Sequence, residues 1–284
     1  MSQEPTRHVI EDDPHDHDRG LAFDVSTLMN RRRALQIFAV GGLATLVGCG
    51  SSGSSGSTTA PSTSGTTAAS TEAPTSVASV IPEETGGPFP ADGSNGVNVL
   101  TETGIVRSDI TRSFGSSSGT AEGIPLSIEM TILDVSTGGT PLEGAAVYLW
   151  HCDREGGYSL YSSGATDQNY LRGVQEAGAD GKVTFRSIFP AAYSGRWPHI
   201  HFEVYPSLAE ATAAGSKLVT SQIALPEDAC KLVYGTTGYE QSVQNLTQTS
   251  LETDNVFSDG YSTQLGTASG SVAEGMTVKL NVGV

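Results

Sequence analysis

Two histidines separated by a single residue stand in a segment that alternates polar and apolar side chains. Residues 198–204 read Pro-His-Ile-His-Phe-Glu-Val. Because alternate side chains of a β-strand share a face, His199 and His201 would point the same way, close enough to bind one metal ion. A half-exposed strand with two polar histidines on its wet side is the ordinary alternative, so the pair alone is a weak indication of a metal site.

Two tyrosines in turns could complete a set of ligands around these histidines. Tyr158 follows two glycines, and Tyr193 closes the segment Phe-Pro-Ala-Ala-Tyr at residues 189–193. Each stands at the end of a predicted strand, where a side chain can point across a cleft, although a packing or surface role is the usual fate of a tyrosine. A phenol with a pKa of about 10 is a poor ligand, but a trivalent cation favours the phenolate. Two histidines and two tyrosines therefore suit ferric iron better than zinc.

The elements that must position these residues are predicted to be strands. Apolar and polar residues alternate over 126–134 and 182–188, the run 145–150 is continuously apolar, and 199–205, 218–225 and 277–282 are further strand segments. Helical periodicity is scarce, with one short candidate at 208–214. Strands at this spacing, separated by Gly, Pro, Asp and Asn, predict an all-β domain over 77–284, either a β-sandwich or a barrel.

Charge and length narrow the classes of function. The 284 residues contain 15 Lys and Arg against 31 Asp and Glu, which gives a net charge of −16. Binding to nucleic acid rests on basic residues that neutralise phosphates, so we expect no nucleic-acid partner. No apolar run reaches the ~20 residues of a spanning helix, which argues against a multi-pass membrane protein.

The N-terminal region has the composition of an export signal followed by a tether. Three arginines at 31–33 precede a short, mostly apolar stretch that ends Leu-Val-Gly-Cys at Cys49. Residues 1–48 thus resemble a twin-arginine signal with a lipobox, and Cys49 would carry the lipid anchor of an exported lipoprotein at the cell surface or in the periplasm of a bacterium. Residues 49–76, rich in Ser, Gly and Thr, are predicted to be a flexible tether.

Two further cysteines fall within the predicted domain. In an oxidising compartment Cys152 and Cys230 could form a disulfide, and the alternative is two buried thiols. Neither belongs to a close cysteine cluster, so a role as a metal ligand is less expected. The sequence leaves the pairing of these two residues open.

The order and spacing of these motifs resemble those of the intradiol ring-cleavage dioxygenases. The resemblance covers about 82–255 and implies a β-sandwich with a prealbumin-like core and long irregular loops. Residues 84–89 resemble the Thr/Gly-Pro loop of that family, and 218–222 resemble the strand that carries its active-site glutamine. The motifs that carry the resemblance are Trp150-His151, Gly157-Tyr158, Phe189-Pro190, Tyr193, Arg196 and Pro198-His199-Ile200-His201.

The resemblance implies a role for each matching residue. A non-haem Fe(III) ion would be held by Tyr158, Tyr193, His199 and His201. Tyr193 would also leave the metal and accept a proton from the substrate. Arg196 would stabilise charge that develops on the substrate ring, with Gln222 as its neighbour; the alternatives are a surface ion-pair partner and an ordinary strand residue. His151 is expected to be structural, and both tryptophans are expected to be packing residues.

The resemblance also implies a reaction, although the substrate stays open. A catechol-type ring would be cleaved by O2 between its two hydroxylated carbons to give a cis,cis-muconate-type diacid. The family's helical N-terminal domain has no expected counterpart, which favours an exported branch similar to the protocatechuate 3,4-dioxygenase beta chain. Protocatechuate, however, carries a carboxylate that needs a cation, and this acidic domain offers no evident candidate besides Arg196. This favours catechol or a hydroxylated catechol derived from lignin-type aromatics as the substrate. The oligomeric state is not predicted.

Two other classes of protein compete with this interpretation. Turns such as Gly-Thr-Pro-Leu-Glu-Gly at 139–144 also occur in surface-tethered β-sandwich modules that bind carbohydrate or protein without a metal. A zinc hydrolase that uses His199 and His201 is a second alternative, but a His-Glu-x-x-His motif is absent. Colour separates the classes, because a ferric phenolate absorbs visible light and a binding module does not.

Overall fold

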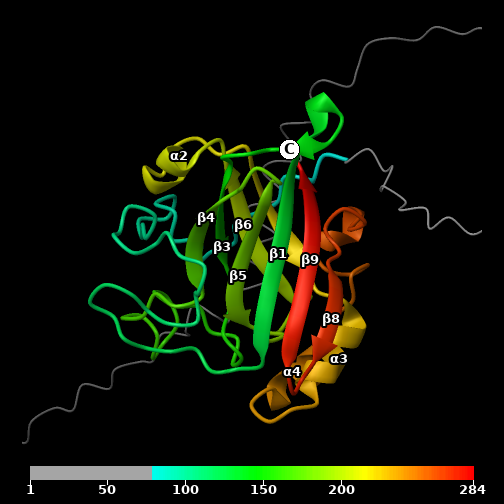
Figure 1. Cartoon of the computed structure of the whole chain (residues 1–284). Coiled ribbons are helices and arrows are strands. Elements are labelled where there is room, and N and C mark those ends of the chain that lie inside the picture. The colour runs from blue at the N-terminus through cyan, green and yellow to red at the C-terminus, as the bar shows by residue number, and fades with distance from the viewer. Residues whose placement is uncertain (1–78) are drawn as a thin grey trace, which may run out of the picture.

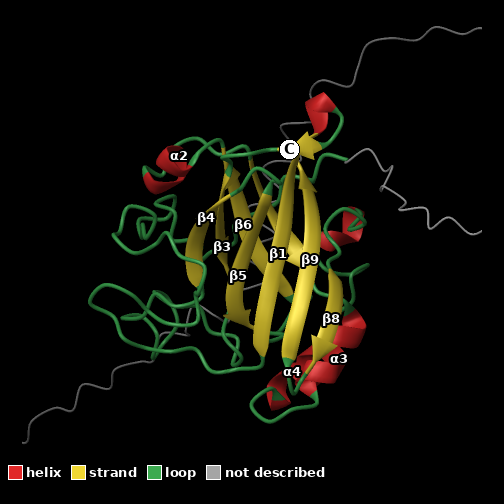
Figure 2. Ribbon diagram, viewed as in Figure 1, coloured by secondary structure: helices red, strands yellow, loops and turns green. Residues whose placement is uncertain are grey.

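The computed structural model describes residues 79–284, and two sheets that face each other form its centre (Figure 1; Figure 2). The predicted signal at 1–48, the tether at 49–76 and Cys49 lie outside the described residues. The all-β prediction is confirmed, and the arrangement is a sandwich, not a barrel. In the described part of the chain, no helix is long and apolar enough to cross a membrane.

The first sheet is built around one long strand. Strand β1 pairs along one side with β9 in a parallel arrangement, and β9 pairs antiparallel with β8. On its other side β1 pairs antiparallel with β5 and, at its end, with the short β2. The strands of this sheet are β1 (Pro125–Asp134), β2 (Thr140–Pro141), β5 (Lys182–Ile188), β8 (Thr267–Ser271) and β9 (Gly275–Gly283).

The second sheet carries the histidine pair. Its strands are all antiparallel in the order β4-β3-β6-β7. In this register His201 lies opposite Trp150 on one neighbouring strand and opposite Gln222 on the other. The strands are β3 (Ala146–Trp150), β4 (Arg172–Glu176), β6 (His199–Tyr205) and β7 (Val219–Ala224).

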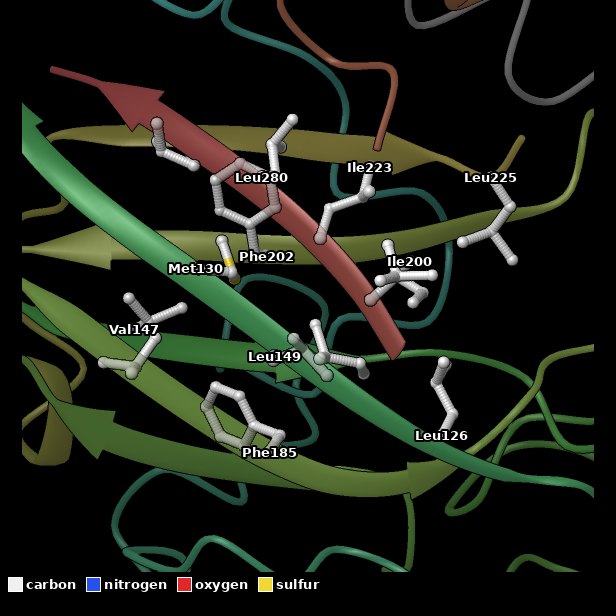
Figure 3. Packing of buried hydrophobic residues seen from close by; sticks show 14 of the residues in the cluster. Leu126, Met130, Val147, Leu149, Phe185, Ile200, Phe202, Ile223, Leu225 and Leu280 are labelled. Atoms are coloured by element: carbon white, nitrogen blue, oxygen red, sulfur yellow. The ribbon is translucent and has the colours of Figure 1, made fainter. Parts of the chain in front are cut away.

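The core between the sheets follows from the alternation of side chains. Leu149 of β3, Phe202 of β6 and Ile223 of β7 point inward and meet residues of β1 and β5 (Figure 3). The same alternation turns His199, His201 and Glu203 to the other face of β6, away from the first sheet. Loops cover that outer face, so all seven residues of β6 are buried although only Ile200, Phe202 and Val204 belong to the core between the sheets.

Short helices fill the connections. Helix α2 begins after Ser207, whose hydroxyl accepts a hydrogen bond from the backbone N–H of Glu210 at 3.2 Å, as N-cap serines do. Helices α3 and α4 lie beside the end of the sandwich near β8 (Figure 1). The helical elements are α2 (Leu208–Thr212), α3 (Glu227–Tyr234) and α4 (Glu240–Leu246), with single 3₁₀ turns η3 (Val135–Thr137) and η4 (Phe257–Asp259).

The two ends of the described chain meet on the first sheet. Val80 forms a parallel bridge with Gly283, and the Ile81 N–H donates to the Gly283 carbonyl at 2.9 Å. The chain then crosses to the second sheet, where the Glu84 N–H donates to the Thr220 carbonyl at 2.7 Å. The last strand of the chain therefore anchors the segment that leads to residues 84–89.

Candidate metal centre

The structure brings the four predicted metal ligands together on the outer face of the second sheet. The hydroxyl oxygens of Tyr158 and Tyr193 lie 3.4 Å apart. The Tyr193 oxygen lies 3.1 Å from Nε2 of His199, and that nitrogen lies 3.1 Å from Nε2 of His201. Side chains from two loops and one strand thus end at a common point.

These spacings fit a metal ion. Ligand atoms that each lie about 2.0–2.1 Å from a metal, at angles of about 90–110° to one another, are separated by about 2.8–3.4 Å. The three donor separations all fall in that interval. In the described part of the chain, no three His, Cys, Asp or Glu side chains gather to hold a metal. The phenol oxygens are therefore needed to complete a ligand set, and such a set favours a hard trivalent cation over zinc.

The protonation states of the imidazoles suit the same role. Nδ1 of His199 lies 2.6 Å from the Trp197 carbonyl, so it carries the proton and leaves a lone pair on Nε2. His201 has no corresponding acceptor at Nδ1 among the described residues. Burial holds the pKa of both histidines well below 6.5, with a further contribution from Arg196, so both rings are neutral.

For the tyrosines, burial disfavours the phenolate, which is the form that would bind a metal. It raises the pKa of Tyr158 well above 10, and the neighbouring Tyr193 raises it further. Without a cation, Tyr158 therefore stays protonated. A bound trivalent cation would reverse this preference, as it does for other acidic ligands. Binding by these tyrosines as phenolates therefore requires a positive charge at the centre of the four donor atoms.

The loop after β3 is shaped to present Tyr158. Asp153 accepts hydrogen bonds at Oδ1 from the backbone N–H groups of Gly157, at 2.7 Å, and Glu155, at 3.1 Å. Gly156, with φ of +92°, lies against Tyr193, and a Cβ there would come within 3.3 Å of the tyrosine Cβ. A larger residue at position 156 would push the two ligand-bearing loops apart.

Aromatic and backbone contacts hold the His201 ring. The Trp150 indole stacks on it with ring centres 5.0 Å apart and planes 3° from parallel. Gly87, with φ of +68°, also meets this ring, since a Cβ there would lie 3.4 Å from Cε1 of His201. Trp150 was predicted to be a packing residue, and it packs on a predicted ligand. Sequence reasoning did not anticipate this contact or that of Gly87.

Arg196 and Gln222, predicted to be neighbours, are in direct contact. Nη2 of Arg196 donates to Oε1 of Gln222 at 2.7 Å, and Nε2 of Gln222 donates to the Thr85 carbonyl at 2.9 Å. Nε of Arg196 forms an ion pair with Asp254 at 2.9 Å, and both side chains are almost fully buried. Arg196 is buried and therefore is not a surface ion-pair partner, and Gln222 lies within strand β7 with its side chain on Arg196.

Asp254 is a functional candidate that sequence reasoning missed. Besides Arg196, its carboxylate accepts the backbone N–H groups of Trp197 at 2.7 Å, Val256 at 2.9 Å and Phe257 at 3.2 Å. These bonds fix the direction of the guanidinium next to the predicted ligands. A single aspartate in a loop 58 positions from its arginine partner gives no local signal.

The remaining expectations concern structural residues. His151 is buried, with Nδ1 2.7 Å from the Cys152 carbonyl and Nε2 2.7 Å from the Ser187 hydroxyl, which agrees with a structural role. Nε1 of Trp197 donates to the Leu225 carbonyl at 2.9 Å within a small apolar cluster. Cys152 and Cys230 are separate, buried thiols, and burial raises the pKa of both, so the disulfide alternative is wrong for this structure.

Comparison with known proteins identifies relatives of this part of the chain. A family model described as "Dioxygenase" matches residues 102–199, a range that contains three of the four predicted ligands and Arg196. Chlorocatechol 1,2-dioxygenase of Rhodococcus opacus is 42% identical over 57 residues, which are 20% of this chain and 22% of that protein. A catechol 1,2-dioxygenase of Pseudomonas sp. (strain EST1001) is 32% identical over 110 residues, 32% of this chain and 34% of that protein.

A solved structure resembles a larger share of the chain. The intradiol ring-cleavage dioxygenase of Tetranychus urticae aligns with a TM-score of 0.53 and 26% identity, over 64% of this chain and 87% of that one. The matches to the curated relatives span between about a fifth and a third of the length of those proteins. The fold of the described residues is thus similar to that of the Tetranychus urticae dioxygenase over most of the length of that structure.

Proposed function

We propose that this chain belongs to the intradiol ring-cleavage dioxygenase family, that it binds non-haem Fe(III) and that it uses O2 to cleave a catechol-type ring. Cleavage falls between the two hydroxylated carbons, and both oxygen atoms enter the product, a cis,cis-muconate-type diacid. The observation that carries the proposal is the convergence of two phenol oxygens and two imidazole nitrogens at separations of 3.1–3.4 Å.

Tyr158, Tyr193, His199 and His201 would hold the iron. A bound ferric ion would supply the redox chemistry that makes a catechol ring reactive toward O2. The chain contributes four ligands on rigid supports and a buried surrounding with few competing water molecules. Because the ligands come from one strand and two tied loops, their positions are set before substrate arrives.

The two tyrosines differ in a way that assigns the proton acceptor. Tyr158 is 3% exposed and its backbone N–H donates to the Ser162 hydroxyl at 2.8 Å. Tyr193 is half-buried and precedes the exposed residues Ser194 and Gly195, the latter with φ of +83°. Tyr193 therefore has the freedom to swing away from the centre and to accept a catechol hydroxyl proton at its own oxygen. Tyr158 stays in place.

The Arg196–Asp254 pair bears on the class of substrate. The guanidinium is oriented toward the site by a buried carboxylate, so the pair as a whole is close to neutral. A neutral pair can donate hydrogen bonds to oxygen atoms on a ring, but it gives little net attraction for a carboxylate substituent. This supports catechol or a hydroxylated catechol over protocatechuate, as was expected from the charge of the chain.

We also propose that residues 1–48 direct export and that Cys49 carries a lipid anchor, with 49–76 as tether. The support is the arginine cluster, the short apolar stretch and the lipobox-like end of the segment. The product would then form outside the cytoplasm. Mass spectrometry of the N-terminal peptide of the mature protein tests this, since a lipidated cysteine as its first residue is the expected result.

The decisive experiment is an O2-uptake assay with catechol, hydroxyquinol and protocatechuate, followed by mass analysis of each product. We expect one O2 consumed per ring and a product heavier than its substrate by both oxygen atoms, with ¹⁸O2 labelling both. Protocatechuate should be the poorest substrate. A colourless protein that consumes no O2 would refute the proposal and favour the binding-module alternative.

A further inference from the structure

One arginine behind the candidate metal centre is buried without an acidic partner. Arg172 of β4 is 1% exposed, and in the part of the chain that the structure describes no carboxylate lies within ion-pair distance of it. Its five N–H donors are all used. Nε donates to the Ser159 hydroxyl at 3.0 Å, Nη1 to the Pro90 carbonyl at 3.0 Å and the Tyr148 hydroxyl at 3.1 Å, and Nη2 to the Phe89 carbonyl at 3.0 Å and the Ser159 carbonyl at 2.9 Å.

Such a residue needs an explanation, because a buried charge without a counter-ion is costly. A neutral residue could fill the space. The planar guanidinium, however, joins by hydrogen bonds two loops and a strand that are distant in sequence. Those partners are the loop at 158–162, the loop at 84–90 and strand β3. All three partners contact the candidate metal centre.

The connections from Arg172 to the predicted ligands are short. Ser159, which it binds twice, is the residue after Tyr158. The ring of Phe89, whose carbonyl it also binds, lies 5.3 Å from the ring of Tyr158. Arg172 and the groups that it binds, here called the Arg172 clamp, therefore hold the Tyr158 loop both at its backbone and at the neighbouring ring of Phe89.

A second route leads to His201. The Tyr148 hydroxyl, which accepts from Arg172, donates to the Pro90 carbonyl at 2.7 Å. The Tyr148 ring stacks on Trp150 with centres 4.9 Å apart, and Trp150 stacks on His201. A displacement of the guanidinium would thus disturb the support of a ligand on the strand as well as one on the loop.

We propose that Arg172 is a positioning residue that fixes Tyr158 and the aromatic support of His201 in ligand geometry before the metal binds. The inference rests on the proposed metal centre, but it does not depend on which catechol is the substrate. Lysine cannot replace this arginine, because an ammonium is a point donor and cannot span several acceptors in one plane. Arg172→Lys thus keeps the charge and removes the fork.

Arg107 provides a matched control. Its guanidinium also donates to several backbone carbonyls, those of Arg112, Asn169 and Arg172, and lies over the ring of Phe114 at 4.5 Å. Among the described residues, the hydrogen bonds and ring contact of its side chain involve neither a predicted ligand nor the loop at 84–90. Arg107→Lys therefore removes a comparable number of hydrogen bonds from the same region.

The test uses the full chain freed of metal. Ferrous sulfate is titrated in without oxygen, the sample is exposed to air, and the visible phenolate-to-iron band is recorded together with the iron dissociation constant. Arg172→Lys should weaken iron binding about 10- to 100-fold, the usual effect of removing a residue that orients a ligand, and should shift the band. Arg107→Lys should lower the thermal midpoint of the metal-free chain while band and affinity stay within about twofold of wild type.

Should Arg172→Lys fail to fold, Tyr148→Phe tests the same clamp, since it deletes one hydroxyl and keeps the ring. It should shift the band in the same direction by a smaller amount. An unchanged band and affinity in the clamp variant, or an equal change in Arg107→Lys, would overturn the inference. These outcomes are independent of catechol turnover. A wild-type chain that shows the band without turnover refutes the proposed function and leaves the role of Arg172 standing.

Discussion

Glu84 gives a quantitative prediction about pH and stability. This residue is 8% exposed at the start of the loop that covers His201. Burial, and secondarily the negative charge of Asp259, raise its pKa from 4.5 to about 7. Nε2 of Gln264 donates to Oε1 of Glu84 at 3.5 Å, and the buried Oε1 of Gln264 has no hydrogen-bond partner among the described residues. A protonated carboxyl suits these surroundings better than a carboxylate.

The raised pKa means that the folded chain holds this proton more tightly than the unfolded chain does. The resulting stabilisation is fully present below about pH 4.5 and is lost as the pH rises through about 7. A difference of about 2.5 pKa units corresponds to about 3 kcal/mol. Glu84→Gln cannot ionise, and its amide can donate to Oε1 of Gln264. The variant should therefore gain about 3 kcal/mol relative to wild type between pH 4.5 and pH 8.

Urea unfolding at several pH values measures this change, with the fluorescence of the two buried tryptophans as the signal. Glu83→Gln is the control, because Glu83 is the adjacent residue on the same loop and is exposed to solvent. Its stability curve should follow that of wild type. If the difference between Glu84→Gln and wild type were the same at pH 4.5 and pH 8, the assigned protonation of Glu84 would be refuted.

Three further predictions concern the candidate centre. Tyr158→Phe removes one of the two proposed phenolate ligands, so it should weaken and shift the visible band and abolish turnover, whereas Tyr161→Phe, on the same loop, should leave the band unchanged; absorption spectra of the iron-loaded variants decide this. Asp254→Ala removes the buried carboxylate of the ion pair with Arg196, so it should cost about 3–5 kcal/mol in urea unfolding, and the double variant without either side chain should lose less than the sum of the single losses. Reduction followed by a ferrous chelator should remove colour and turnover, and added iron should restore both; turnover by metal-free protein would contradict the assignment.

The strands that build the site could be predicted because their pattern is local. Alternation over 199–205 reproduces β6 to the residue, and the predicted strands near 126–134, 145–150, 182–188 and 218–225 correspond to β1, β3, β5 and β7. The same alternation places both imidazoles on one face. A slip by one residue would replace them with Ile200 and Phe202, so the register of β6 carries both core and site.

The elements that escaped prediction depend on distant partners. Strand β4 begins Arg-Gly, which is atypical of a buried strand, and its arginine is buried only because loops from two other regions supply acceptors. Helix α3 contains its buried residues at 229, 230, 233 and 234, a helical spacing obscured by a short length and a preceding proline. Asp254 and Gly87 likewise acquire their roles through contacts that no local pattern encodes.

The pairing of Ile81 with Gly283 joins the far end of the chain to the centre that would hold iron. Six positions separate Ile81 from Gly87, the residue seated against His201. The final strand, β9, therefore holds in place the segment 81–87, which covers His201. Deletion of the last residues would therefore loosen this segment without changing a predicted ligand. A fusion partner attached after Val284 would strain the same strand pairing.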